Sequence, residues 1–458
     1  SNDECRKPAP YDEYHSKEVF YMTDNHRDFN IALTGDSFIT TKISDYKEPD
    51  FIEAFDIIRS QDLGFTNLEV LLNDFKGIPA AQSGGTYAGA PTALADELKW
   101  AGFQIVARAN NHSLDYSYEG LRITTDTLNQ KGIIHAGVGE NLAEARSPSY
   151  LETHFGRVAL LSASSSFAPW GRAGHTRPDF QGRPGLSPLR YQTRFLINSE
   201  QFQAMRQIEE SLGIRAAKEQ AKKMGWDQPD DEKELSIGQA TFVESDMPGI
   251  ETKPNAGDVK EITKWIKDAR RQADWVLFTL HAHESQLDRT VPADFIVEFA
   301  KACIDAGADM FIGHGPHVLR GIEIYKGKPI FYSLGNFIFQ NDLVYKHPQD
   351  IYDRFGLTLE DTPADMYDKR SNNDQSGFPG DPIYWESIIA VTHFKDNKLS
   401  TIELIPISLG HEKPRSQRGK PAVARGEKAQ KILSDLKKMS EPFGTSIAIC
   451  DDRGYINL

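Results

Sequence analysis

Residues 310–317 read Met-Phe-Ile-Gly-His-Gly-Pro-His, a short apolar run followed at once by two histidines. The run 310–313 has the length and composition of a buried β-strand. Polar side chains follow four other apolar runs in the same way. These runs are 31–34 before Asp36, 64–68 before Glu69, 104–107 before Asn111 and His112, and 275–280 before His281, His283 and Glu284. Five strands that end in Asp, Glu, Asn or His therefore dominate the sequence pattern.

Helical patterns separate these strands and predict an α/β fold. Helices are expected at 50–59, 91–101, 118–130 and 293–305, and a further strand is expected at 158–162. Alternation of strands and helices is typical of helices packed on a sheet. Beyond residue 322 the pattern changes to strand-like runs with short turns, at 321–325, 330–334, 387–394 and 401–405. We expect these later runs to form a second, mixed or antiparallel sheet.

Two stretches interrupt this pattern. Residues 167–188 are rich in Gly, Pro and Arg and precede a polar helical stretch at 200–225, and residues 341–382 are polar with little periodicity. Long loops of this kind are usually functional, so they are interpreted either as lids beside a site or as surface decoration. The predicted organisation is a tail at 1–29, a domain at 30–410 with insertions at 167–272 and 341–383, and a packed extension at 411–458 with a helix at 422–439.

Composition excludes several classes of protein. The chain has 52 basic and 66 acidic residues and a formal net charge of −14, which argues against a nucleic-acid partner. An anionic substrate remains compatible, because a bound cation reverses the local sign. No apolar run approaches the roughly 18 residues of a membrane-spanning helix, and three cysteines are too few for a disulfide framework. Cys5 is either a free thiol or the acylated residue of a lipoprotein.

The polar residues at the strand ends have a common chemical interpretation. Ligands of α/β proteins bind beyond the carboxyl ends of the strands, so these side chains are expected to meet in one crevice. Carboxylate and amide oxygens are hard ligands, and imidazole binds Zn, Fe or Mn. Alone, each residue has a structural explanation as a turn or a helix cap. Their coincidence at five strand ends favours one or two divalent metal ions (Mn, Zn or Fe) that activate water for hydrolysis.

Four motifs resemble the CapA family of poly-γ-glutamate capsule-biosynthesis proteins. They are Gly35-Asp36, Asn67-Leu68-Glu69, Asn110-Asn111-His112-Ser113-Leu114-Asp115 and Gly313-His314-Gly315-Pro316-His317-Val318-Leu319. Stretches 135–139, 306–309 and 332–337 strengthen the resemblance, which covers roughly 30–166, 273–340 and 384–410. The family is similar to the calcineurin-like metallophosphoesterases. The resemblance therefore implies a four-layer α/β/β/α sandwich of the metallophosphoesterase type, with long insertions.

The resemblance also implies roles for individual residues. Asp36 would bind one metal, Glu69 would bridge two, and Asn111 with His281 would bind the second, while His314 and His317 resemble the last histidine ligands of the superfamily. His112 resembles the histidine that protonates the leaving group, oriented by Asp115. Substrate contacts are expected from His283, Glu284, Arg108 and Asn67, and His283 is alternatively a replacement ligand. Arg172, Arg177 and Arg183 are further candidates for holding carboxylate or phosphate groups.

Three functions remain open at this point. The first is a metal-dependent hydrolase that acts on poly-γ-glutamate or another γ-glutamyl amide during capsule polymer biosynthesis or processing. The second is a phosphomonoesterase or phosphodiesterase that uses the same metals. The third is a non-catalytic accessory protein of capsule polymer assembly. Expected partners are an anionic polymer or a small γ-glutamyl or phosphorylated substrate, with the capsule-synthesis machinery as a further partner. The expected location is the cell envelope or the exterior after removal of a signal peptide, with the cytoplasm as the alternative.

Overall fold

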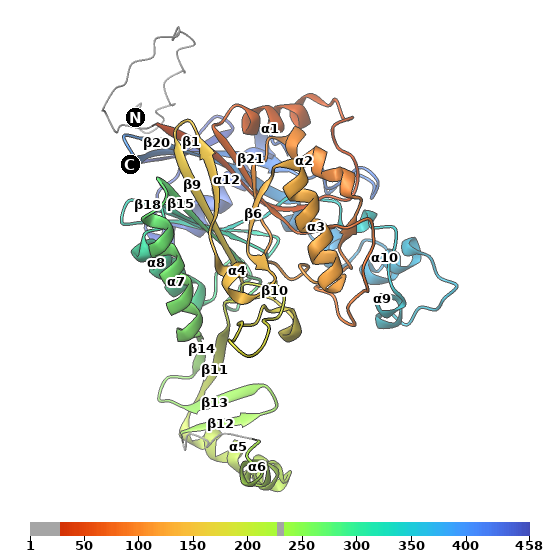
Figure 1. The fold of residues 1–458 in the computed structure, drawn as a ribbon, viewed down its shortest axis with the longest axis vertical. Coiled ribbons are helices and arrows are strands. Elements are labelled where there is room, and N and C mark those ends of the chain that lie inside the picture. The colour runs from red at the N-terminus through yellow and green to blue at the C-terminus, as the bar shows by residue number, and fades with distance from the viewer. Residues whose placement is uncertain (1–27, 227–232) are drawn as a thin grey trace.

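The computed structural model describes residues 28–226 and 233–458, and these form a mixed α/β fold with several mixed sheets (Figure 1). The α/β class predicted from the sequence is confirmed. Cys5 and most of the predicted tail lie outside the described residues. In the described part of the chain, the largest sheet has ten strands. They are β1 (Phe29–Phe38), β2 (Leu63–Leu68), β5 (Ile105–Ala107), β6 (Ile134–Ala136), β19 (Asn336–Phe339), β20 (Glu386–Lys395), β21 (Lys398–Ser408), β22 (Ala422–Val423), β23 (Ala448–Cys450) and β24 (Arg453–Asn457).

A second large sheet faces the first. Its strands are β8 (Ser149–Thr153), β9 (Gly156–Ser164), β15 (Trp275–His281), β16 (Met310–His314), β17 (Leu319–Tyr325) and β18 (Lys328–Leu334). Phe29 and Phe65 of the first sheet and Leu277 and Ile312 of the second belong to one buried apolar cluster. The two sheets therefore pack face to face. Short pairs β3 (Leu71–Leu72) with β4 (Gly89–Ala90) and β7 (Val138–Gly139) with β10 (Gly185–Leu186) lie outside these sheets.

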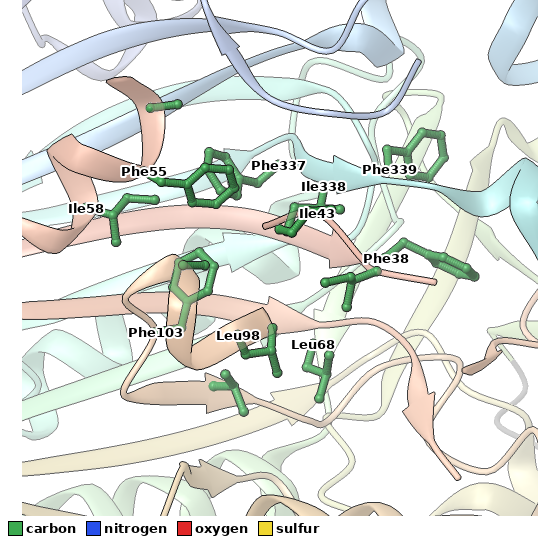
Figure 2. Close-up of a cluster of buried hydrophobic side chains, with 14 of the residues drawn as sticks. Phe38, Ile43, Phe55, Ile58, Leu68, Leu98, Phe103, Phe337, Ile338 and Phe339 are labelled. Carbon is green, nitrogen blue, oxygen red and sulfur yellow. The ribbon is translucent and has the colours of Figure 1, made fainter. Parts of the chain in front are cut away.

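Helices cover the outer faces of the two sheets (Figure 1). The first sheet carries α1 (Pro49–Arg59), α2 (Ala95–Ala101) and α3 (Ser117–Lys131), and the second carries α7 (Ala256–Arg270) and α8 (Asp294–Ala306). The rings of Phe55 and Phe103 pack edge-on against the ring of Phe337 in β19, within a buried cluster that also contains Leu98 and Ile338 (Figure 2). Burial of each such side chain contributes about 1.5–3 kcal/mol. This packing holds β19 against β1, and both strands carry polar residues of the candidate site described below.

The later strands do not form a separate sheet, and that prediction is wrong. β17 and β18 extend the sheet of β16, whereas β20 and β21 extend the sheet of β1, with Phe29 opposite Phe394. The chain crosses from one sheet to the other between β18 and β19, at Gly335, where φ is +71°. Local apolar patterns define strands but leave their partners open, because pairing depends on contacts between distant segments.

A module of a sheet and two helices projects from the body (Figure 1). It contains β11 (Tyr191–Ile197), α5 (Ser199–Ser211), α6 (Ile214–Lys223), β12 (Glu234–Ile237), β13 (Ala240–Glu244) and β14 (Gly249–Pro254). The predicted insertion at 167–272 also includes α7, which packs on the body. Its residues Ile262 and Ile266 are buried in the same cluster as Phe299 of α8. The projecting part is therefore shorter than the predicted insertion.

The second insertion and the C-terminal extension are joined by ion pairs. The insertion contains α9 (Gln349–Arg354), α10 (Pro363–Ser371) and α11 (Gly377–Gly380), and the extension contains α12 (Gly426–Ser440). Arg418 contacts Asp342 at 2.6 Å and Asp374 at 3.0 Å, and Arg415 contacts Asp368 at 2.6 Å. The short helix α4 (Leu142–Arg146) completes the helices of the described residues. No helix within residues 28–226 and 233–458 has the length and apolar character needed to cross a membrane.

Candidate functional site

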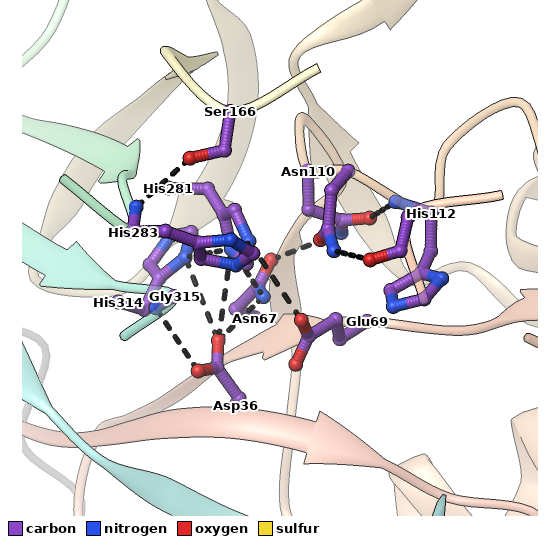
Figure 3. A network of polar contacts seen from close by, with 12 residues as sticks. Asp36, Asn67, Glu69, Asn110, His112, Ser166, His281, His283, His314 and Gly315 are labelled. Atoms are coloured by element: carbon purple, nitrogen blue, oxygen red, sulfur yellow. Dashed lines mark hydrogen bonds and ion pairs between the residues drawn. The ribbon is translucent and has the colours of Figure 1, made fainter. Parts of the chain in front are cut away.

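The carboxyl ends of strands from both large sheets meet at one place (Figure 3). Asp36 and Glu69 come from β1 and the end of β2, and His281 and His314 end β15 and β16. Local structure explains the position of Asp36. The ladder between β1 and β2 is irregular between Leu33 and Asp36, and a Cβ atom at Gly35 would overlap the carbonyl oxygen of Gly335. Glycine is therefore required for the close approach of the two segments.

Two carboxylates lie fully buried at this junction. The Oδ1 atom of Asp36 accepts a hydrogen bond from the Asn67 side-chain amide at 2.8 Å, and its Oδ2 atom accepts one from the Gly315 backbone at 3.0 Å. Burial raises the pKa of Asp36 to about 7. Neither oxygen of Glu69 has a hydrogen-bond partner. Burial, and then the neighbouring charge of Asp36, raise the pKa of Glu69 well above its usual range.

Four imidazoles surround the carboxylates. The Nδ1 atom of His281 lies 3.0 Å from Nδ1 of His314, and its Nε2 atom lies 3.1 Å from Nε2 of His283. His317 has a positive φ of 61°, and its Nδ1 atom contacts the side-chain oxygen of Asn336 at 2.8 Å. Burial lowers the pKa of His314 to about 3 and that of His317 to about 4, and lowers those of His281 and His283 strongly. Neutral imidazoles are the form of histidine that binds metals.

The donor atoms form overlapping groups that fit a divalent cation. The groups are Asp36 with His281 and His314, Glu69 with His281 and His283, and Asp36 with Glu69 and His317; within each group the donor atoms lie within 4.8 Å of one another. Both oxygens of Glu69, the Asn111 side-chain oxygen and Nε2 of His314 are buried without hydrogen-bond partners. Unpartnered buried carboxylate oxygens are costly, and a cation held by the groups that contain Glu69 would satisfy them. The site is therefore compatible with metal binding, and its nitrogen and oxygen donors suit Mn, Zn or Fe.

A histidine–carboxylate pair stands beside these donors. The Nδ1 atom of His112 lies 2.7 Å from Oδ2 of Asp115, and Asp115 also accepts hydrogen bonds from the backbone of Ala88 at 2.8 Å and Gly84 at 3.2 Å. These contacts leave Nε2 as the ring nitrogen of His112 that can meet a ligand. Asn111 precedes His112, and its side-chain amide donates to the Gly84 carbonyl at 3.0 Å. The structure thus brings together the residues predicted as catalytic and the residues predicted as ligands.

Three of the predicted substrate residues, Arg108, Glu284 and Asn67, do not line either cavity described below. The Arg108 guanidinium donates to the hydroxyl of Thr125 at 2.8 Å and to the carbonyl of Leu121, both on α3. Burial lowers its pKa to about 9. Glu284 accepts hydrogen bonds from Ser165 at 2.6 Å and from Ser166, and the Ser166 hydroxyl in turn accepts one from the backbone of His283. Asn67 is fully buried beside Asp36.

The three arginines of the first insertion that were predicted to bind an anion also lie away from the site. Arg183 donates to the backbone carbonyl of Arg172 at 3.0 Å, and Arg177 pairs with Asp179 at 2.9 Å. None of the three lines the cavities described below. Other residues of this insertion, Phe167 and Trp170 among them, do line a cavity. The insertion thus reaches the site through aromatic side chains rather than through the predicted arginines.

Two adjoining cavities open at the cluster. The first has a volume of about 290 Å³, and its lining includes His112, His283 and His317 together with Arg289 and Arg370. The second has a volume of about 260 Å³, and its lining includes Phe167, Trp170 and Leu186. Gly84, Asn111 and His283 line both cavities. Arg289 and Arg370 were not predicted, because neither lies in a motif. The one relevant signal was the interpretation of 341–383 as a lid, since Arg370 belongs to that stretch.

The fold and the site together define a class of protein. It is a mixed α/β protein whose buried cluster of carboxylates and imidazoles is compatible with a metal site. Comparison with known families gives a narrower assignment. The model of the family described as "Bacterial capsule synthesis protein PGA_cap" matches residues 30–341, and the chain belongs to this family. The resemblance to CapA proteins seen in the sequence is thereby confirmed.

Individual relatives agree with this assignment. The chain is 38% identical over 443 residues to the uncharacterized protein y4sH of Sinorhizobium fredii (strain NBRC 101917 / NGR234), covering 94% of this chain and 93% of the relative. It is 26% identical to the capsule biosynthesis protein CapA of Bacillus anthracis, covering 62% of this chain and 51% of the relative. It is 28% identical to a probable polyglutamine synthesis accessory protein of Mycobacterium tuberculosis (strain ATCC 25618 / H37Rv), covering 51% and 44%. The chain thus spans about half the length of the last two relatives.

Proposed function

We propose that this protein is a metal-dependent hydrolase that cleaves a γ-glutamyl amide, in poly-γ-glutamate or a related compound, during capsule polymer processing. The observation that carries this proposal is the unpartnered carboxylate of Glu69 among four buried imidazoles, next to the His112–Asp115 pair. Fully buried carboxylates without partners are costly unless a cation compensates them. The two large sheets and their outer helices are proposed to represent the four-layer sandwich of the metallophosphoesterases.

The residues that would hold the cations follow from the donor groups. Asp36, His281 and His314 would hold one ion, and Glu69, whose oxygens both lack hydrogen-bond partners, belongs to the two other groups that would hold an ion. Asn111 would contribute its unpartnered side-chain oxygen. His283 and His317 belong to the remaining donor groups. A divalent ion at such a site supplies Lewis-acid polarisation of a carbonyl or phosphoryl oxygen and lowers the pKa of water.

The His112–Asp115 pair would handle the proton of the leaving group. The carboxylate of Asp115 accepts a hydrogen bond from the Nδ1–H group of His112, and two backbone amides donate to the same carboxylate and fix it. This arrangement selects the tautomer of the imidazole and orients the ring. The Nε2 atom of His112 would therefore take up the proton that the attacking water loses and donate it to the leaving amine nitrogen. General acid catalysis of this kind contributes about 10²–10⁴-fold in rate.

Hydrolysis of a phosphoester is the second candidate function. Arg289 and Arg370 on the cavity wall would suit phosphate as well as carboxylate. A non-catalytic role in polymer assembly is the third, in keeping with the name of the Mycobacterium tuberculosis relative, which describes an accessory protein. The unpartnered atoms of the cluster weigh against an unused site. Location in the cell envelope or the exterior stays a prediction.

A substrate screen of the metal-loaded protein tests this proposal. The probes are γ-glutamyl anilide, γ-glutamyl dipeptides and an aryl phosphate, each with Mn²⁺ or Zn²⁺, alongside a measurement of metal per chain. We expect His112→Ala to keep its metal and lose at least about 10²-fold in turnover, and Glu69→Ala to lose metal. His154→Ala, at an exposed histidine, is the matched control and should change neither. A wild-type protein that binds no metal and cleaves no probe would contradict the hydrolase and favour the accessory role.

A further inference from the structure

Two arginines from distant parts of the chain lie on the wall of the first cavity. Arg289 follows β15 in a loop, and Arg370 belongs to α10 in the second insertion. Arg370 donates a hydrogen bond to the hydroxyl of Thr86, which lines the same cavity. The guanidinium carbon of Arg289 lies 5.0 Å from the centre of the Tyr384 ring. Both side chains are therefore held by neutral groups.

Neither guanidinium forms an ion pair with an acidic residue in the described parts of the chain. Within residues 28–226 and 233–458, no carboxylate oxygen lies within 4.0 Å of a side-chain nitrogen of Arg289 or Arg370. Arg418, in contrast, contacts two carboxylates at the edge of the same insertion. The chain has 66 acidic residues, so carboxylates are abundant. Two unneutralised guanidinium groups beside a cavity leave their positive charge for an external anion.

The position of Arg289 is fixed relative to the histidine cluster. Arg320 is almost completely buried, with 1% of its surface exposed. Its Nε atom donates to the backbone carbonyl of Arg289 at 3.0 Å, and its Nη2 atom donates to the backbone carbonyl of His283 at 3.3 Å. One buried side chain thus holds both the loop of Arg289 and a member of the candidate metal centre. Such bracing is expected of a binding residue that must keep a constant distance from the reacting bond.

The positive charge lies on one side of the site only. The lining of the second cavity contains no Arg or Lys among the described residues, and its aromatic members are Phe167 and Trp170. The two cavities meet at Gly84, Asn111 and His283. A substrate that crosses this boundary would place an anionic group in the first cavity and an uncharged group in the second.

We infer that Arg289 and Arg370 form an anion subsite that binds a non-reacting carboxylate or phosphate group of the substrate. This inference rests on the proposed function, because it places the reacting bond at the boundary of the two cavities. Guanidinium groups bind such oxyanions through paired N–H donors. The subsite therefore selects substrates that are acidic on one side of the scissile bond, as a γ-glutamyl residue with a free α-carboxylate is.

A binding experiment tests the subsite separately from turnover. The Mn²⁺-loaded His112→Ala protein is titrated by calorimetry with γ-glutamyl anilide, with its α-carboxamide, and with inorganic phosphate. We expect the free acid to bind at least about tenfold more tightly than the amide, a difference of about 1.4 kcal/mol. Arg289→Gln and Arg370→Gln, each added to His112→Ala, should lose about tenfold for the acid and leave the amide unchanged. Lys369→Gln, which removes an exposed charge from the same helix, is the matched control and should bind like its parent.

The possible outcomes separate the subsite from the hydrolase. Arginine variants that bind the acid as tightly as the parent, or that weaken acid and amide equally, overturn the subsite. The subsite is also overturned if the His112→Ala parent binds neither the acid nor phosphate. Arg289→Gln, at an exposed position, decides the matter if Arg370→Gln does not fold. Phosphate that binds in the same arginine-dependent way while the acid does not would assign the subsite to phosphate. Arginine-dependent binding without hydrolysis by the wild type would refute the hydrolase and leave the subsite.

Discussion

Replacement of Glu69 by leucine should stabilise the protein when metal is absent. Both carboxylate oxygens of Glu69 are buried without hydrogen-bond partners, and burial and the charge of Asp36 raise its pKa well above the usual range. Removal of an unsatisfied buried polar group recovers about 1–3 kcal/mol. The entropy of unfolding of a chain of 458 residues is about 1 kcal/mol per kelvin. The melting temperature of metal-free Glu69→Leu should therefore rise by about 1–3 °C.

Metal should reverse the order of the two proteins. A divalent ion at one hundred times its Kd stabilises the wild type by about 2.7 kcal/mol, which corresponds to a rise of about 3 °C. Glu69→Leu should gain much less. Scanning calorimetry with a chelator and then with excess Mn²⁺ measures both effects.

Glu97→Leu provides the matched control. Glu97 is also buried, but its Oε2 atom accepts hydrogen bonds from the backbone of Ile43 at 2.9 Å and Ser44 at 2.7 Å. Its replacement leaves two donors without partners and should lower the melting temperature. If Glu69→Leu lowered the melting temperature of the metal-free protein as much as Glu97→Leu, the reasoning that Glu69 is unsatisfied without a cation would be refuted.

Three further predictions follow from single residues. Gly35→Ala would drive a Cβ atom into the Gly335 carbonyl. We therefore expect the free energy of unfolding to fall by at least about 3 kcal/mol, measured as a lower melting temperature and a lower soluble yield. Unchanged stability would contradict the close approach of the two segments. Burial, and then the charge of Arg108, lower the pKa of His135 to about 3. Below pH 6.5 the unfolded chain therefore binds a proton that the folded chain does not, and the free energy of unfolding falls as the pH falls. His135→Gln should remove about 2 kcal/mol of the difference in this free energy between pH 7 and pH 5, measured by urea unfolding at both pH values. Asp115→Asn should lower turnover about 10²-fold with the metal content unchanged, and parallel loss of metal would show that Asp115 supports the ligands instead.

The strands that carry the site could be predicted closely from the sequence. The run 275–280 became β15 (Trp275–His281), and 310–313 became β16 (Met310–His314). Strands buried on both faces are continuous apolar runs, and this signal is local. The meeting of Asp36 with His281 and His314 also followed from the rule that ligands bind beyond the carboxyl ends of strands. The two carboxylates and the imidazoles in fact come from two facing sheets, which still end at the same edge.

Features that depend on distant contacts could not be predicted. The pairing of β20 with β1 joins residues more than 350 positions apart, and no local pattern encodes it. The helix α7 lies in the stretch 167–272, which the resemblance to CapA proteins does not cover, yet its apolar residues Ile262 and Ile266 pack on the second sheet. Arg289 and Arg370 lie in stretches without motifs. Only the folded chain shows that they share a cavity with His112.

The bridge from Arg418 to Asp342 and Asp374 ties the wall of the binding cavity to a part of the chain beyond the matched family region. Arg418 thus contacts the stretch 341–383 at two residues, and that stretch carries Arg370. Arg418→Met would keep every candidate ligand and still remove both of these contacts to the wall. The ability to discriminate between acidic and neutral compounds would then be lost before the capacity to hold a cation.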